Sequence, residues 1–109
     1  MTQSKWVRVG SVRRFDLVSS FKPQAIAPLE RAADAYQAWK AWKIAARHGA
    51  DGAMTDMLRR RLLDACADLI QATLNLVAAL GVEDFRPWMK ACERRNRERW
   101  RISDGEVDE

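Results

Sequence analysis

The sequence predicts an all-α protein, because apolar residues recur with helical spacing in three stretches that turn signals separate. The strongest stretch covers residues 62–81, LLDACADLIQATLNLVAALG, which is apolar on nearly every side. The other two cover residues 28–47 and 85–96. Gly49 comes shortly after the stretch 28–47, and Gly81 ends the stretch 62–81. Glycine is a typical residue for ending a helix. We therefore expect a helical bundle.

The chain of 109 residues is long enough for one domain with a modest core. A helical fold of this size is often completed by dimerisation, so a homodimer or higher homo-oligomer is expected. We expect three parts: an N-terminal arm or short hairpin over residues 1–22, a helical domain over 23–102 and an acidic flexible tail over 103–109. For the first part, the alternation Trp6-Val7-Arg8-Val9 favours strands, while an extended arm fits equally well.

Composition excludes several classes of protein. Residues 1–10 show no secretion signal, and no apolar run reaches the ~18 residues that span a bilayer, so no membrane partner is expected. Cys66 and Cys92 fall at core-facing helical positions and are expected to be free thiols in a reducing cytoplasm. With a single histidine and no Cys-x-x-Cys pair, a zinc site is not expected.

Three helices are expected in chain order. The first begins near Pro28 and runs to about Arg47, and the second runs from about Met54 to Leu80 behind an Asp51 or Thr55 cap. The third follows an Asp84 cap and has a strongly basic outer side. The apolar sides are expected to comprise Leu29, Ala32, Ala33, Tyr36 and Trp39 or Trp42 in the first helix, and Phe85, Trp88, Met89 and Cys92 in the third.

Four polar residues interrupt the most apolar stretch: Asp64, Asp68, Gln71 and Asn75. Their spacing of +4, +3 and +4 places them on one helix face. A helix that is apolar almost all round should be buried, and a buried carboxylate must be paired, hydrogen-bonded or bound to a metal. The two aspartates therefore favour a functional site or a buried pairing with arginine over the alternative of a solvated helix edge, whereas the two amides are also consistent with satisfied core groups.

The first helix carries a matching pattern in Glu30, Asp34 and Gln37. If the two helices pack side by side, four carboxylates come together, and a divalent cation would relieve their repulsion. Oxygen ligands of this kind suit Mg²⁺, which usually also binds substrate phosphates. A structural role explains Glu30 and Asp34 equally well, because both lie near the expected start of a helix, where the helix dipole favours acidic residues.

Five short segments stand out by their order and spacing: KPQAI and PLERAAD in residues 22–34, ADLIQATLNL and ALGV in residues 67–82, and RNRER in residues 95–99. Together they resemble the small MazG-like, all-α nucleoside triphosphate pyrophosphohydrolases. The resemblance extends over roughly residues 22–102.

The resemblance implies a helical fold that associates into dimers or higher oligomers. It also implies hydrolysis of a nucleoside triphosphate to a monophosphate and pyrophosphate. In the family, Mg²⁺ is held by an E-x-x-E motif on one helix and an E-x-x-D motif on the next. Here the first motif reads Arg31-Ala32-Ala33-Asp34 and the second Ala65-Cys66-Ala67-Asp68, so only the last acid of each is present.

Losing two carboxylates and gaining a guanidinium changes the local charge by about three units, which weakens Mg²⁺ binding unless other groups compensate. Glu30 and Asp64, one residue earlier in each motif, are the candidates for compensation because an i,i+4 pair shares a helix face. The expected roles are therefore metal binding for Asp34 and Asp68, catalysis for Glu30 and Asp64, and substrate binding for Arg31, Gln71, Asn75, Asn96 and Arg97.

Two functions follow from the sequence. The first is Mg²⁺-dependent pyrophosphohydrolysis of a nucleotide, with a metal-bound water as the nucleophile. The second is a catalytically inactive member of the fold that acts as a protein- or nucleotide-binding adaptor or inhibitor. The missing acids at Arg31 and Ala65 favour the second. Nucleic-acid binding through residues 86–101 is not expected, because Glu93 and Glu98 interrupt the basic run.

Overall fold

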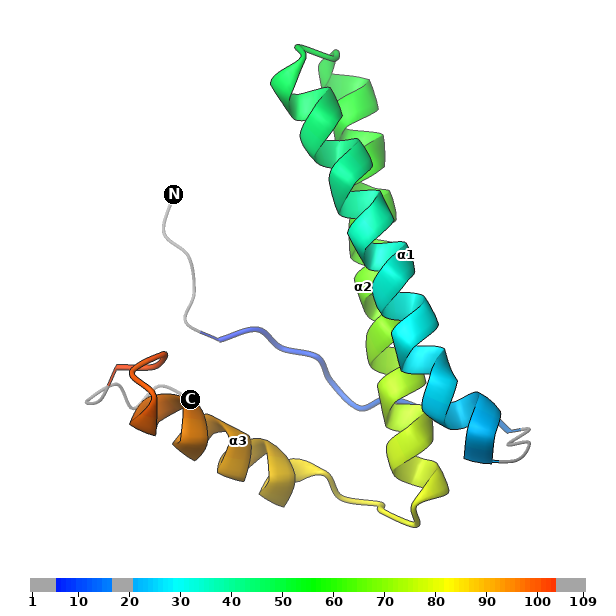
Figure 1. The fold of residues 1–109 in the computed structure, drawn as a ribbon, viewed down its shortest axis with the longest axis vertical. Coiled ribbons are helices and arrows are strands. Elements are labelled where there is room, and N and C mark those ends of the chain that lie inside the picture. Colours follow the sequence, from blue (N-terminus) through cyan, green and yellow to red (C-terminus); the bar gives the residue numbers. More distant parts are fainter. Residues whose placement is uncertain (1–5, 17–20, 104–109) are drawn as a thin grey trace.

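The computed structural model describes residues 6–16 and 21–103, and within these ranges it contains three α-helices and no strand (Figure 1). Helix α1 is Phe21–Arg47, α2 is Gly52–Ala79 and α3 is Arg86–Glu98. The prediction of an all-α fold is confirmed. Residues 6–16 form an arm without secondary structure, so the strand hairpin that was one alternative for the N-terminus does not form in this segment.

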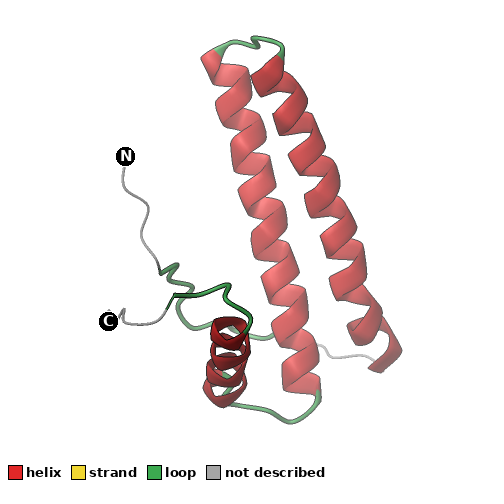
Figure 2. Cartoon of the chain, turned by 60° about the vertical axis from the view of Figure 1, so that its left-hand side comes forward, coloured by secondary structure: helices red, strands yellow, loops and turns green. Residues whose placement is uncertain are grey.

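Helices α1 and α2 form a long antiparallel hairpin (Figures 1 and 2). Gly49 allows the chain to turn because its φ is 70°, a left-handed conformation that side chains with a Cβ rarely adopt. Asp51 then caps α2, since its carboxylate accepts a hydrogen bond from the Met54 N–H at 2.8 Å. The expected turn and the Asp51 cap are both present.

The expected start of α1 near Pro28 is wrong, because the helix begins seven residues earlier at Phe21. Pro23 occupies the first turn, where its missing N–H would have no intrahelical partner in any case. Pro28 lies inside the helix instead. It sits on the face that α2 covers, and packing between the two helices therefore outweighs the local cost of an interior proline.

One face of each helix forms the contact between α1 and α2, which we call the seam. Its residues alternate at steps of three and four, the spacing of helices that pack nearly antiparallel along their whole length. All are partly or fully buried: Gln24, Pro28, Arg31, Ala35, Ala38, Trp42 and Ala45 in α1, and Thr55, Leu58, Leu62, Ala65, Leu69, Ala72, Leu76 and Ala79 in α2.

The seam is rich in alanine, so the two helices approach closely but bury little side-chain volume. Among the described residues, Ala72 is the only buried hydrophobic residue. The accessible surface is 9243 Å², compared with about 6,200 Å² for a compact protein of this mass. The radius of gyration is 16.9 Å, compared with about 13 Å for a compact chain of this length. A single copy therefore leaves much apolar surface in water.

The expected apolar side of the first helix is mostly wrong. Trp42 lies in the seam, but Leu29 is 73% exposed and Tyr36 is 56% exposed. Cys66, expected to face the core, is also exposed. The reason is that the seam is narrow: a two-helix contact buries about two positions in every seven, whereas a full bundle buries a wider stripe.

Helix α3 lies apart from the hairpin and makes no helix–helix packing contact with α1 or α2 in the part of the chain that is described (Figure 2). Trp88 and Met89, which the sequence placed on an inward stripe, are 55% and 54% exposed. Their spacing is helical as expected, but no element of the single chain covers them.

Helix α2 is long and apolar enough to cross a membrane by length and composition alone, with a mean hydropathy of 1.4 in its most apolar window. This differs from the expectation that no apolar segment reaches this length. The core helices of soluble proteins pass the same test, and α2 carries Asp64 and Asp68 in its middle turns. One such helix is weak evidence for a membrane span.

The N-cap residue of α3 is Phe85, whose side chain makes no capping hydrogen bond, so the predicted Asp84 cap is wrong by one residue. Asp84 lies directly before Phe85 and contacts Arg86, the first residue of the helix. Its carboxylate accepts hydrogen bonds from the Arg86 N–H at 3.1 Å and from the Arg86 guanidinium at 2.9 Å. These bonds favour the charged form, and they lower the pKa of the Asp84 carboxyl from 3.8 to about 2.

We predict that a carboxyl titration followed by NMR will place the Asp84 midpoint near 2, and that Arg86→Ala will return it toward 3.8. Because the pKa is lowered in the folded state, the helix-start contact is fully present above pH 3.8 and is lost as the pH falls through about 2. An unshifted Asp84 midpoint in the unmodified protein would contradict the contact between Asp84 and Arg86.

Candidate functional site

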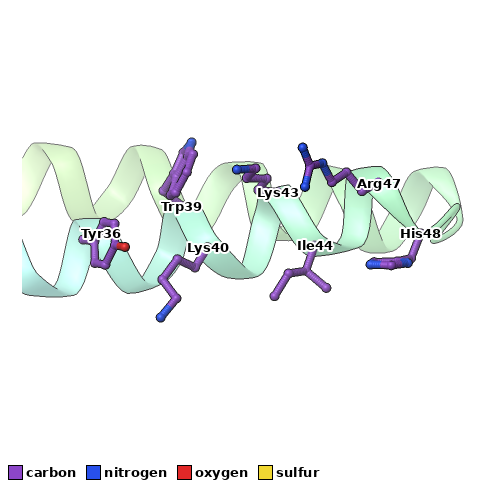
Figure 3. Close-up of a pocket in the computed structure, with 7 residues that line it drawn as sticks. All are labelled: Tyr36, Trp39, Lys40, Lys43, Ile44, Arg47 and His48. Carbon is purple, nitrogen blue, oxygen red and sulfur yellow. The ribbon is translucent and has the colours of Figure 1, made fainter.

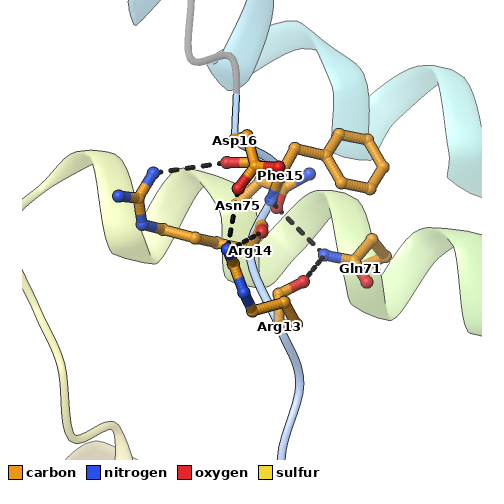
Figure 4. A network of polar contacts seen from close by, with 6 residues as sticks. All are labelled: Arg13, Arg14, Phe15, Asp16, Gln71 and Asn75. Atoms are coloured by element: carbon orange, nitrogen blue, oxygen red, sulfur yellow. Dashed lines mark hydrogen bonds and ion pairs between the residues drawn. The ribbon is translucent and has the colours of Figure 1, made fainter.

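The arm crosses α2 at two of the polar residues predicted to bind substrate (Figure 4). The Gln71 side-chain amide donates a hydrogen bond to the Arg13 carbonyl oxygen at 2.9 Å. The Phe15 N–H donates one to Asn75 Oδ1 at 3.1 Å, and Gln71 Nε2 donates to the same oxygen at 3.0 Å. The two amides therefore bind the backbone of an extended segment at alternate residues.

Asn75 is only 5% exposed and is the one buried polar residue in the described part of the chain. Its side-chain oxygen is satisfied by the arm and by Gln71, as buried polar groups require. Gln71 and Asn75 thus act in this structure as structural amides that hold the arm, which was the second of the two interpretations that the sequence left open.

The four acidic residues of the predicted metal site are exposed. Asp64 and Asp68 were expected to be buried, and this expectation is wrong for the single chain. Next to the two aspartates, the face of α2 that packs against α1 is formed by the partly buried seam residues Leu62, Ala65 and Leu69. On α1, Glu30 and Asp34 are exposed in the same way.

The acids nevertheless lie on one side of the hairpin. Each of them immediately precedes a seam residue, as Asp34 precedes Ala35 and Asp68 precedes Leu69. In two antiparallel right-handed helices, positions that precede the seam point to the same side of the pair. We call this the acidic side, and it carries Glu30, Asp34, Asp64 and Asp68, with Gln71 and Asn75 further along α2.

Arg31 and Ala65, which replace the first acids of the resembled motifs, are both seam residues and partly buried. Arg31 Nε lies 3.4 Å from Asp34 Oδ2, so the guanidinium contacts the carboxylate that was expected to bind metal. Both side chains are substantially exposed, and this ion pair contributes little to stability. It does, however, place a positive charge beside one of the two acids that match the family pattern.

Within the described ranges, no three side chains of the metal-ligating types His, Cys, Asp and Glu lie close enough together to hold a metal ion. An octahedral Mg²⁺ site with protein carboxylates needs oxygen atoms that converge on one point. The acidic side therefore has the right chemistry for Mg²⁺, but its residues do not fit the ion within one chain.

Asn96 and Arg97, the two substrate-binding candidates of α3, are not brought to the acidic side. Asn96 Nδ2 donates to the Cys92 carbonyl oxygen at 3.0 Å, and Asn96 Oδ1 accepts from the Arg101 guanidinium at 3.1 Å. Arg97 pairs with Glu93 at 3.3 Å. Both residues are engaged in contacts within their own helix and its C-terminal end.

A second cluster of side chains lies at the turn end of α1 and was not singled out as a site from the sequence (Figure 3). The Tyr36 and Trp39 rings stack with their centroids 5.9 Å apart. The Lys40 ammonium lies 5.4 Å from the Tyr36 centroid, and the Lys43 ammonium lies 4.7 Å from the Trp39 centroid. We call this group, with Ile44, Arg47 and His48, the tip groove; it encloses a shallow volume of about 300 Å³.

A sequence signal for the tip groove exists. Residues 35–50 contain no acid, yet they contain two lysines, an arginine, a histidine and three aromatic residues. The aromatic and basic residues recur at helical spacing, but the same pattern is also produced by the apolar side of a buried helix. Only the structure separates Trp42, which lies in the seam, from Trp39, which belongs to the groove.

Comparisons of this chain with family models, with curated proteins and with solved structures find no match. The all-α architecture is compatible with the resemblance to the MazG-like proteins, and the resemblance remains an interpretation of the sequence.

We predict that Asn75→Ala will release the arm. The change removes an acceptor shared by Phe15 and Gln71 and should lower the free energy of unfolding by about 1 kcal/mol for each lost hydrogen bond. Hydrogen exchange of the Phe15 amide should become several-fold faster. Gln37→Ala, which removes an exposed amide on α1, is the matched control; equal exchange rates in the two variants would contradict the contact.

Proposed function

We propose that the chain is a non-catalytic helical subunit that functions by association, within the MazG-like type that its sequence resembles. The observation that carries this proposal is the side of the hairpin opposite the acids, where large apolar side chains are exposed in a row. Residues that immediately follow a seam residue point to this side, by the same geometry that places the acids together. We call it the apolar side: Leu29 (73% exposed), Leu63 (52%) and Ile70 (40%). Tyr36 and Trp39 also follow seam residues, but they belong to the tip groove.

A second copy of the chain is the partner that this surface fits first. Exposed apolar side chains in a continuous row mark an interaction surface. Two hairpins packed through this row would form a four-helix arrangement, which supplies the core that one hairpin lacks. The accessible surface exceeds that of a compact chain by about 3,000 Å², an area that also includes the separate helix α3 and is more than an obligate interface, which buries about 1,000–2,500 Å² per partner, needs from each copy.

The second support is the lack of a complete set of metal ligands on the acidic side. Arg31 contacts Asp34, and Ala65 offers no ligand, so a catalytic ion lacks converging carboxylates within one chain. A subunit that has lost such a site retains the fold and its association surface. Binding without hydrolysis is the function that these two features support together.

We predict that sedimentation will show an oligomer for the unmodified chain and a monomer for the double variant Leu63→Glu, Ile70→Glu. Two charges on the apolar side would have to be buried without partners, which strongly disfavours association. Gln37→Glu with Ala41→Glu places two charges on exposed positions of the other side and should leave the oligomer intact. A monomeric unmodified chain, or equal dissociation of both variants, would argue against the proposal.

Nucleotide pyrophosphohydrolysis is the second candidate function. It is supported by the placement of Glu30, Asp34, Asp64 and Asp68 on one side of the hairpin, next to the amides of Gln71 and Asn75. For hydrolysis, a second copy of the chain would have to contribute further metal ligands or cover the acidic side.

Melting and product assays separate the two functions. Under the binding proposal, millimolar Mg²⁺ with a panel of nucleoside triphosphates releases no pyrophosphate, and any nucleotide stabilisation persists in Asp68→Ala. An enzyme would release pyrophosphate, and its melting midpoint would rise by several degrees at saturating ligand. Loss of both effects in Asp68→Ala, with Asp56→Ala as the control for a nearby α2 acid, would establish the enzyme instead.

A further inference from the structure

We infer that the tip groove is a docking site for an acidic helix of another protein. The inference deepens the proposed function by naming a partner class, and it rests on that function. Its basis is the arrangement of the side chains along α1, where two rows at i,i+4 spacing border the groove (Figure 3). One row contains Trp39, Lys43 and Arg47, and the other contains Tyr36, Lys40, Ile44 and His48.

The shape of the groove fits a helix. Rows of residues four apart form ridges on a helix surface, and the space between two such ridges accepts a ridge of a second helix. All of the lining residues come from α1 and the start of the following turn, so the groove is an open trough rather than an enclosed pocket. A partner helix can lie along it without displacing any other part of the described chain.

The charge of the groove selects an acidic partner. No Asp or Glu occurs between Asp34 and Asp51, so the cations of this segment have no acidic neighbour in sequence. Two copies paired tip to tip would bring the same cations together, which like-charge repulsion disfavours. A helix with carboxylates at i,i+4 spacing presents the complementary charge at the same repeat.

The two lysines are held in place before a partner arrives. Lys40 lies over the Tyr36 ring and Lys43 over the Trp39 ring, and these cation–π contacts restrict side chains that would otherwise be freely mobile. Restricted side chains lose less conformational entropy on binding.

The test measures binding of a labelled alanine-based helical peptide with glutamate at every fourth position, by fluorescence anisotropy with the full chain. A peptide with glutamine at those positions and a (dT)12 oligonucleotide are the comparison probes. The double variant Lys40→Gln, Lys43→Gln should bind the glutamate peptide roughly tenfold more weakly, because two charge contacts are lost. Lys90→Gln with Arg94→Gln removes the same charge from exposed positions of α3 and should bind within about twofold of the unmodified chain.

Two peptide results would overturn the inference: no binding of the glutamate peptide, or equal weakening in the two double variants. Two results with Lys40→Gln, Lys43→Gln would also overturn it. One is loss of oligonucleotide binding that is tighter than peptide binding in the unmodified chain, and the other is dissociation of the oligomer. The last would mean that a second copy occupies the groove. Sedimentation of the Leu63→Glu, Ile70→Glu variant tests the proposed function without any peptide, so the two proposals can fail separately.

Discussion

The contact between α1 and α2 is the interaction on which the rest of the structure depends. Its residues follow steps of three and four in both helices, and alanine occupies six of the fifteen positions. Close approach of the helices sets the register of the hairpin and divides its remaining surface into two sides. Glu30, Asp34, Asp64 and Asp68 precede seam residues, whereas the apolar side consists of residues that follow them, so these two groups point to opposite sides of the hairpin.

The same contact explains why the candidate metal site is incomplete. Arg31 and Ala65 occupy seam positions, where a carboxylate would be partly buried between the helices. Alanine is a good seam residue, and the arginine extends from the seam to Asp34. Arg31 and Ala65 are thus compatible with the packing of the hairpin, but neither supplies a carboxylate to a metal ion. Glu30 and Asp64 lie farther from the seam and point into solvent.

The arm brings a distant segment of the chain into contact with the polar residues of α2. Its hydrogen bonds to Gln71 and Asn75 use backbone atoms of Arg13 and Phe15, so these bonds depend little on the arm's side chains. Residues far from one another in sequence thereby satisfy a buried amide that the sequence alone marked only as polar and core-like.

Helical periodicity, the Gly49 turn and the Asp51 cap determined the number and order of the helices and the connection between α1 and α2, because these signals are local. Periodicity also determined that the two acids of each helix share a face of that helix. The tertiary structure alone decided which apolar face becomes the seam, because Leu29, Tyr36, Trp39 and Trp42 are equally apolar and only packing against α2 selects Trp42. It likewise decided that Asp64 and Asp68 face solvent, since burial depends on how many neighbours surround a helix and α2 has one helix neighbour in the described chain.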